Sequence, residues 1–418
     1  MDRAKLQIVR LPEEKEMVES LSRSVNLPVL RRLAKENPLS GYSREYYYSL
    51  KATTLPVKGG INRRLEDVFR RVRSELGLLD EPIEMFVVIE ESFNCHLEIA
   101  SNKVLPSILR LSHTFAQTLN EKEIAYVLGH ELGHLIFEHG ETGEALSLLY
   151  PKKDSMPEHI KRQYKYLHQL QELSADRIGL ITSGDLEASL RMLLTGASGL
   201  PENLLNLDLE GILDYAQKIV DDLKGINIQP ELSHPGTPIR ILALKAFANS
   251  ELYKWVINDE PGENQPVQDP MLEEKMGELL SLIRVYPSDT QEYWLMIGEA
   301  AAIWMIISAD KSVSPQEREG LLDVISKFCS CPETVAREIS EKGAETFLEV
   351  AVNYFKLNAP SKLDGMIGEI ALFIVRDKRI EDKELETFIE IMGKYFGVEK
   401  SSAILAIVAA LRVTSRET

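Results

Sequence analysis

The sequence predicts an α+β fold, in which a mostly helical domain with a small sheet is followed by an all-α domain. Short runs of strand-forming residues lie between residues 83 and 112, and stretches with helical periodicity surround them. From about residue 286 nearly the whole chain has a helical pattern. Because 418 residues are many for one core, two or three domains are expected.

Composition predicts four segments along the chain. Residues 1–55 are expected to form an N-terminal helical segment, and residues 56–257 the α+β domain. Residues 258–285 are expected to be a linker, since "NDEPGENQPVQDP" has three prolines, four acidic residues and no apolar period. Residues 286–418 are expected to form the helical domain.

Three apolar runs predict strands, and "TTLPVKGG" before them predicts a loop. The runs are "IEMFVVI", "HLEIA" and "LPSILRLS". An amphipathic helix from Ile61 is expected to end at Gly77. Asn120 is expected to be the N-cap of another helix, with Glu123 in the capping-box position. A long helix is expected from about Glu158 to Ile181.

The overall charge and the apolar runs exclude several classes of partner. A formal net charge of −17 argues against nucleic acid and anionic membranes as partners. No secretory signal is visible, and the longest apolar run, Ala300–Ala309, is about half of the roughly 20 residues that a membrane span needs. Three cysteines cannot build a disulfide framework, so a cytoplasmic location is expected.

The stretch "HELGH" predicts a metal site. His130 and His134 are four residues apart on the expected helix, so both imidazoles project from one face and can share one tetrahedral ion. Glu131 lies about 100° further around the helix, where it can take a proton from a metal-bound water. This is the H-E-x-x-H pattern of a catalytic zinc site with one Zn²⁺ per chain.

A catalytic zinc site needs a third protein ligand, which the long helix offers in "YLHQLQELSADRIG". Glu172 is favoured and His168 stays open as the alternative. Asp176 is expected to accept a hydrogen bond from His130 or His134. His139 is expected to pair with carbonyls near the helix end, because it lies about 140° around the helix from His134.

Three ordered motifs carry a family resemblance. "HELGH", "ELSADRIGL" and "SHPGTPIRILAL" resemble the signatures of the HtpX/CAAX-prenyl-protease/Oma-type zinc metallopeptidases, which are gluzincins. The resemblance covers roughly residues 60–250 and implies a zincin-type fold. It implies that Glu131 is the general base. It places His234 near the zinc, where it steadies the oxyanion or plugs the site, and Arg240 as a structural ion-pair former.

Two departures from the family pattern concern the substrate and the ligand motif. The family's Asn-Ala-Phe reads Asn94-Cys95-His96 here, so Asn94 is a candidate substrate-binding residue in an altered pocket wall. The family's Glu-x-Glu-Ala-Asp motif has Ser174 in place of its second acid.

The C-terminal segment resembles another family. "AAIWMIISADKSVSPQEREGLLDVI" and "ALFIVRDKRIEDKELETFIEIM" are similar to each other and to TerB-like (tellurite-resistance) helical domains. They predict a repeated helix–loop–helix unit. Asp310 and Asp377 are expected to cap helices rather than to hold a cation.

The sequence therefore predicts a zinc-dependent endopeptidase that acts on unfolded or extended proteins. The substrate is expected to pair with an edge strand near Pro106–Ser112. The alternative is a latent or inactive zinc protein, with His234 blocking the metal, that serves as a stress-associated adaptor. In that case the C-terminal helical domain would bind a protein partner.

Overall fold

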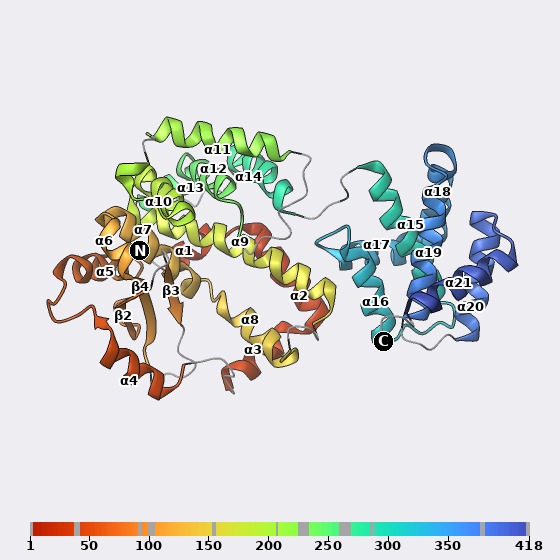
Figure 1. Cartoon of the computed structure of the whole chain (residues 1–418), viewed down its shortest axis with the longest axis horizontal. Helices are drawn as coiled ribbons and strands as arrows, with labels where there is room; N and C mark the ends of the chain where they lie inside the picture. The colour runs from red at the N-terminus through yellow and green to blue at the C-terminus, as the bar shows by residue number, and fades with distance from the viewer. Residues whose placement is uncertain are drawn as a thin grey trace. The chain divides into compact units, whose positions relative to one another are not determined.

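A computed structural model gives the architecture for residues 3–36, 42–90, 94–98, 105–152, 156–205, 208–224, 234–258, 269–284, 287, 289–376 and 381–414. The chain divides into two compact units. Unit 1 comprises Met1–Met156 and Tyr164–Ile283, and unit 2 comprises Pro157–Gln163 and Arg284–Thr418. In Figure 1 the colour of unit 1 runs from red to teal, and most of unit 2 runs from teal to blue. Helices predominate beside one small sheet, as the predicted α+β class requires.

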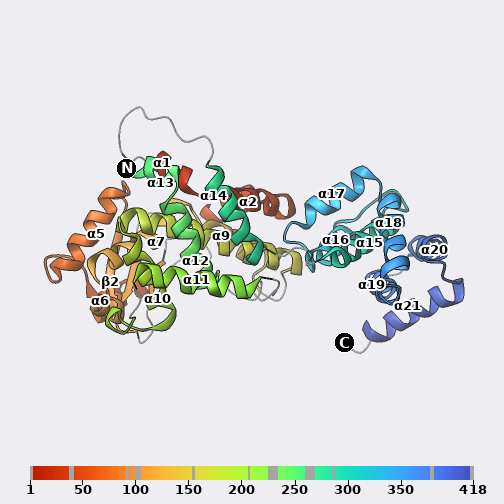
Figure 2. The same cartoon turned by 90° about the horizontal axis from the view of Figure 1, so that it is seen from above.

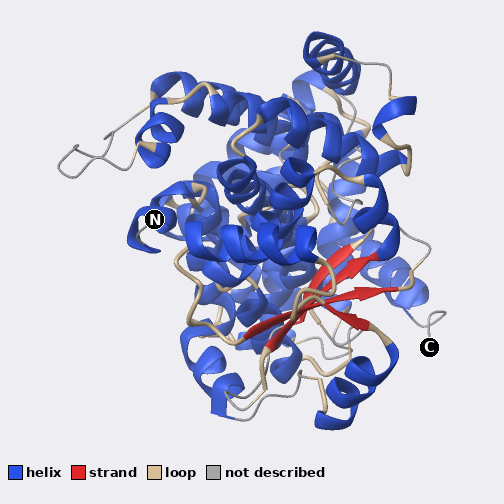
Figure 3. Cartoon of the chain, turned by 90° about the vertical axis from the view of Figure 1, so that its left-hand side faces the viewer, coloured by secondary structure: helices blue, strands red, loops and turns tan. Residues whose placement is uncertain are grey.

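The sheet of unit 1 has four strands in the order β1-β2-β4-β3 (Figure 3). Strand β2 pairs in parallel with β4, whereas β1 pairs antiparallel with β2, and β3 antiparallel with β4. The strands are β1 Leu55–Pro56, β2 Ile83–Val88, β3 Cys95–Glu98 and β4 Ser107–Ser112. The three predicted strands are confirmed, and β1 lies in a segment for which a loop was predicted.

The strand order corrects the predicted edge. Strand β4, in the Pro106–Ser112 segment, lies between β2 and β3 and has no free edge, so that prediction is wrong. The edge on this side of the sheet is β3, which turns back along β4 with Leu97 opposite Leu109. A parallel β2–β4 pair leaves the outer side of β4 open, and the short β3 covers it.

Unit 1 contains most of the helices, and capping residues explain where two of them begin. Asn62 accepts a hydrogen bond from Leu65 N at the start of α5, and Asn120 forms the predicted capping box with Glu123. The helices are α1 Arg3–Val9, α2 Pro12–Val25, α3 Leu27–Glu36, α4 Arg44–Thr53, α5 Arg63–Glu75, α6 His113–Thr118, α7 Glu121–Ile136, α8 Gly140–Leu149, α9 Glu158–Ser183, α10 Leu186–Ser198, the 3₁₀ turn η2 Glu202–Leu204, α11 Leu209–Leu223, α12 Thr237–Ala248, α13 Glu251–Ile257 and α14 Pro270–Ile283. Helix α9 belongs to unit 1 from Tyr164 onward, and its first residues belong to unit 2.

The N-terminal segment is helical, as predicted, but it is part of unit 1 rather than a separate piece. The Leu11 backbone N–H donates to Ser174 Oγ on α9, and Arg177 of α9 donates to the Val9 carbonyl. Arg177 is buried, so its bond to a carbonyl of α1 satisfies a charged group that would otherwise be costly to bury. The polar composition of residues 1–55 therefore conceals buried contacts with the core of unit 1.

The predicted linker is wrong over its second half. Residues 270–283 form helix α14, which packs on α12 in unit 1. Five residues of α14 are buried, namely Leu272, Met276, Leu279, Leu280 and Ile283. Residues 259–268 lie outside the described part of the chain. The boundary between the units falls after Ile283.

Unit 2 is all helical, as Figure 2 shows for its blue half. Its helices are α15 Thr290–Ile307, α16 Pro315–Ser326, α17 Pro332–Lys342, α18 Ala344–Asn358, α19 Lys362–Val375, α20 Asp382–Ile391, the π-helical turn η4 Met392–Phe396 and α21 Lys400–Thr414. Each of the two segments that resemble each other in sequence leads into a helix that begins with a capping box, at Ser314 for α16 and at Glu381 for α20. Asp310 does not cap a helix as predicted, because Ser314 is the N-cap of α16; Asp310 instead accepts a hydrogen bond from Ser312 N in the turn before it. Asp377 lies outside the described residues.

The longest apolar run of the sequence is the core of unit 2. On α15, Ala300, Ala301, Ala302 and Ile303 are fully buried among α16, α18 and α19. Along the described part of the chain, we find no helix that is both long and apolar enough to cross a membrane. The hydrophobic character of this run is therefore explained by packing within unit 2.

Candidate metal centre

Helix α7 places two histidines side by side. His130 and His134 are one turn apart, and their Nε2 atoms face each other at 3.2 Å. Both rings face α9, where Glu172 lies within 3.5 Å of each. The spacing in the sequence is therefore realised as a shared ligand face.

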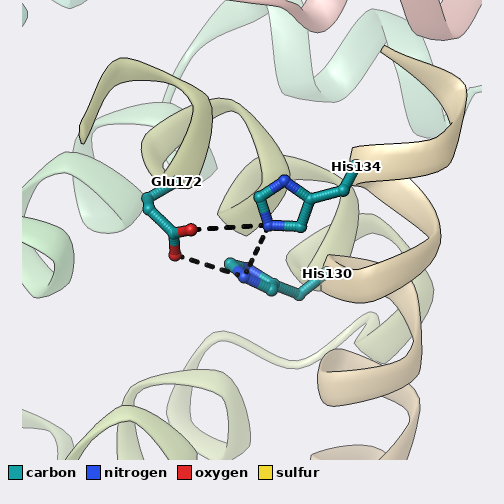
Figure 4. Close-up of side chains that lie close together, drawn as sticks. All are labelled: His130, His134 and Glu172. Carbon is teal, nitrogen blue, oxygen red and sulfur yellow. Dashed lines mark hydrogen bonds and ion pairs between the residues drawn. The ribbon is translucent and has the colours of Figure 1, made fainter. Parts of the chain in front are cut away.

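Glu172 on α9 completes a group of three possible ligands (Figure 4). Its Oε2 lies 3.4 Å from His130 Nε2, and its Oε1 lies 3.5 Å from His134 Nε2. One ligand atom from each residue falls within 4.8 Å of the others, which is a suitable arrangement for one metal ion. The structure thus brings together the three residues that the sequence singled out as ligands.

Glycines allow α7 and α9 to approach closely enough for this contact. A Cβ on Gly129 would lie 3.1 Å from the Gly179 Cα, and a Cβ on Gly179 would lie 2.9 Å from the Tyr126 carbonyl oxygen. Real side chains do not pack at such distances, so the two helices would have to separate. Gly129 on α7 and Gly179 on α9 therefore allow the close helix packing that brings His130 near Glu172.

A buried carboxylate orients His130. Asp176 Oδ1 accepts hydrogen bonds from His130 Nδ1 at 2.9 Å and from the Tyr126 hydroxyl at 2.7 Å. Arg240 of α12 donates to both oxygens of Asp176, at 2.8 and 2.6 Å. Although burial opposes ionisation, this guanidinium lowers the pKa of Asp176. Asp176 and Arg240 occupy the positions that the sequence predicted for them.

A second chain of polar contacts orients His134 and corrects the expectation for His139. His134 Nδ1 lies 2.7 Å from His139 Nδ1, and His139 Nε2 lies 3.1 Å from Glu14 Oε1 on α2. Glu14 is fully buried and also contacts Arg10 and Ser174. His139 does not cap the helix end with its side chain, because the chain turns back after α7 and aims the ring at His134.

These contacts fix which ring nitrogens carry protons. Carboxylates only accept hydrogen bonds, so His130 donates from Nδ1 to Asp176, and the proton of a neutral His139 belongs on Nε2, which lies 3.1 Å from Glu14 Oε1. Burial lowers the pKa of His139, against the effect of Glu14, and a neutral His139 must accept at Nδ1 the proton of His134. Both ligand histidines are left with a bare Nε2.

Bare nitrogens and a carboxylate that converge repel one another unless a cation lies between them. The donor set of two imidazoles and one carboxylate is typical of catalytic zinc sites. A proton on His130 is the alternative to a cation. Burial opposes this proton, but hydrogen bonds to Asp176 and Glu172 raise the pKa of His130 to about 10. The site therefore has a strong preference for positive charge at its centre.

Glu131 points from α7 toward the sheet edge. Its Oε2 accepts a hydrogen bond from the Leu97 backbone N–H of β3 at 3.1 Å. Burial raises the pKa of Glu131 to about 7, against the opposing charge of His130. A carboxyl with this pKa both accepts and releases a proton near neutral pH, as a general base requires.

The two remaining histidines of the expected site lie on the other side of Glu172. His234, in the turn before α12, has its Nε2 at 3.7 Å from Glu172 Oε1, and His168 Nδ1 lies 3.9 Å from the same oxygen. The side chain of His234 is 52% exposed, whereas that of Glu172 is 6% exposed. His168 is thus not one of the three residues grouped with His130, and of the two candidates for a third ligand it is Glu172 that lies beside His130 and His134.

A cavity of about 830 Å³ opens onto the centre. Its lining includes Asn94, Glu131, Met192 and His234, so it connects the edge strand with the metal ligands. Asn94 is exposed at the cavity wall. Its backbone N–H donates to Ser112 Oγ, and its carbonyl oxygen accepts from Ser112 N. A cavity of this size holds a peptide segment of a few residues or a small ligand.

Sequence reasoning missed three supporting residues. Tyr126 lies one turn before His130, and its place on the same helix face was a usable signal. Glu14 and Leu97 had no such signal, because they reach the site from α2 and β3 through tertiary packing.

Comparisons with known proteins add nothing to this picture. The chain matches no model of a protein family, no curated protein and no solved structure. The chemistry of the site itself therefore has to support a functional conclusion.

Proposed function

We propose that this protein is a zinc-dependent endopeptidase that cleaves unfolded or extended protein chains. The observation that carries the proposal is the position of Glu131, a half-buried carboxyl that directly follows His130 and lines a cavity of about 830 Å³. A purely structural metal site has no use for a proton acceptor there. The H-E-x-x-H pattern and the ordered motifs of the metallopeptidase resemblance point the same way.

His130, His134 and Glu172 would hold the zinc ion. A zinc ion in that position would polarise the scissile carbonyl and a water molecule. Glu131 takes the proton of the attacking water and passes it to the leaving amine. Asp176 and His139 keep the two imidazoles in the tautomer that leaves Nε2 bare.

Strand β3 is the proposed docking edge for the substrate. Asn94 O accepts a hydrogen bond from Ser112 N of β4, so Asn94, His96 and Glu98 direct their backbone groups at β4. The backbone N–H and C=O groups of Cys95 and Leu97 alternate with these and point away from β4, in agreement with the hydrogen bond from Leu97 N to Glu131. Backbone pairing at this edge accepts many sequences, which suits unfolded proteins as substrates.

The cysteines support a cytoplasmic location. Cys95, Cys329 and Cys331 are all free thiols, and Cys95 and Cys329 are buried. Free buried thiols suit a reducing compartment. We include the cytoplasm in the proposal on this ground.

Cleavage of casein by the full chain, loaded with one equivalent of zinc, tests the proposal. The parent protein should yield fragments that mass spectrometry identifies, and Glu131→Gln should yield none. Gln keeps an oxygen for the Leu97 N–H but cannot take up a proton, so the fold and the metal content should not change. Glu121→Gln, an exposed acid on the same helix, is the matched control and should cleave like the parent. Equal absence of cleavage in the parent and Glu131→Gln, at full zinc content, would reject the proposal.

A further inference from the structure

A second group of possible metal ligands adjoins the first. One atom each from His168, Glu172 and His234 lie within 4.8 Å of one another. His168 and Glu172 are four residues apart on α9 and share a face, and His234 approaches from the turn before α12. The imidazole rings of His168 and His234 meet edge to face, with their centroids 5.4 Å apart. Three residues from two segments thus surround one point beside the catalytic group.

Glu172 is shared by the two groups. Its Oε2 is directed at His130, at 3.4 Å, whereas its Oε1 lies between the groups, at 3.5 Å from His134 Nε2, 3.7 Å from His234 Nε2 and 3.9 Å from His168 Nδ1. A carboxylate can bridge two cations in this way, with one oxygen for each, and bridged pairs in enzymes lie about 3.5–4 Å apart. The second group therefore does not need to displace an ion held by His130 and His134.

The second group should bind a cation more weakly than the first, because its histidines are more exposed and it has no negative charge of its own beyond the shared Glu172. The side chains of His168 and His234 are 39% and 52% exposed, whereas those of His130 and Glu172 are 11% and 6% exposed. A cation there shares the one negative charge of Glu172 with the first ion, and the Arg240 Nη2 lies 3.8 Å from Glu172 Oε2. Both effects reduce the attraction for a second cation without removing its ligands.

We propose that His168, Glu172 and His234 form a second, weaker site for a divalent cation of the zinc type, and that its occupation inhibits hydrolysis. The regulatory part rests on the peptidase function proposed above. Two imidazoles favour Zn²⁺ over Mg²⁺ or Ca²⁺. An ion at this point takes up His234 and part of Glu172, and it stands in the cavity that the substrate has to enter.

Zinc titration of the full chain, with bound metal counted after equilibrium dialysis, tests the site without any need for activity. The parent should bind one zinc tightly and a second one more weakly. His168→Gln and His234→Gln should each keep the first zinc and lower the affinity for the second at least about tenfold. His113→Gln, a histidine away from the cavity lining, is the matched control and should bind two. Glu131→Gln should also bind two, so the count holds even where no cleavage occurs.

Inhibition of casein cleavage should follow the second binding step. Activity of the parent should fall along the same curve as the second zinc binds, and His168→Gln should show no fall over that range. A parent that binds one zinc even in large excess would overturn the site, and so would second binding that survives in both folded variants. If either variant fails to fold, the ¹¹³Cd spectrum of the parent decides, with two resonances expected and one resonance contradicting the site. Two bound ions with cleavage unaffected would overturn the inhibitory role alone.

Discussion

The Nδ1 atoms of His134 and His139 lie 2.7 Å apart, and this contact joins a ligand histidine to the N-terminal segment of the chain. Behind His139 stands Glu14 of α2, fully buried, at 3.1 Å from His139 Nε2. His130 has an equivalent partner in Asp176. Each ligand histidine of the proposed centre therefore has its own buried carboxylate, one in direct contact and one through a second imidazole.

Glu14→Gln should weaken zinc binding by about 10- to 100-fold, since the loss of an outer partner typically costs a histidine ligand this much. The variant removes the charge that holds His139 in the tautomer that accepts from His134. Competition with a chromophoric chelator measures the effect. Glu16→Gln, an exposed acid on the same helix, should bind zinc like the parent. An unchanged affinity in Glu14→Gln would show that His139 does not orient His134.

Asp176→Asn should destabilise unit 1 by about 3–5 kcal/mol, because Arg240 loses the carboxylate to which it donates two hydrogen bonds and keeps only Glu172, at 3.8 Å, as a charged neighbour. Urea unfolding of the metal-free chain measures this loss. The double variant Asp176→Asn, Arg240→Gln should lose less than the sum of the two single variants, since no unpaired charge remains. If the loss of stability in the double variant equals the sum of the losses in the two single variants, the Asp176–Arg240 pair has no coupling energy, which would contradict this account.

Gly129→Ala should destabilise unit 1 by about 1–3 kcal/mol and reduce zinc affinity, because the added methyl group pushes α7 away from α9. The matched control is Gly277→Ala on α14, where a Cβ would meet no atom within 4 Å. This substitution should be neutral or stabilise the chain by about 0.4–1 kcal/mol. Thermal melting compares the two, and equal melting temperatures would contradict the close approach of the helices.

Much of the centre is predictable from the sequence because its geometry is local. The capping box of Asn120 fixes where α7 begins, and the period of the helix then places His130 and His134 on one face. The choice between Glu172 and His168 is not local. Both lie on the same face of α9, and only the packing of α9 on α7 decides which one meets the histidines.

The features that the sequence did not reveal depend on contacts between distant segments. Glu14 looks like any acid in a polar helix until α2 packs against α9. The edge strand differs from the prediction because the order in which strands pair is set by the topology of the sheet, which the sequence of a single strand does not reveal. The extent of the linker was overestimated because the buried face of α14 exists only where α12 covers it.

Unit 2 should become less stable as the pH rises from about 4.5 to 8, through Glu299 of α15. Burial, and then the charge of Glu369, raise the pKa of Glu299 to about 8 from an ordinary 4.5. The folded chain therefore keeps this proton where the unfolded chain releases it, so stability is lost across that window and levels off above it. The loss is on the order of a few kcal/mol.

Glu299→Gln should remove this loss, so its melting temperature should exceed that of the parent by more at pH 8 than at pH 5. Tryptophan fluorescence follows mainly unit 2 once Trp255 of α13 in unit 1 is replaced by Phe in both proteins, because Trp294 and Trp304 both lie on α15. Glu390→Gln, an exposed acid on α20, serves as the control and should show no such pH-dependent gain. A constant difference between Glu299→Gln and the parent at both pH values would mean that Glu299 titrates normally.

The coordination of zinc at one equivalent per chain tests the central claim most directly, and X-ray absorption at the zinc edge measures it. An open catalytic centre predicts two imidazole ligands, from His130 and His134, with oxygen in the remaining positions. A third imidazole would contradict the account, since it would mean that His234 or His168 closes the site. The chain would then be a zinc-holding binding protein rather than a peptidase.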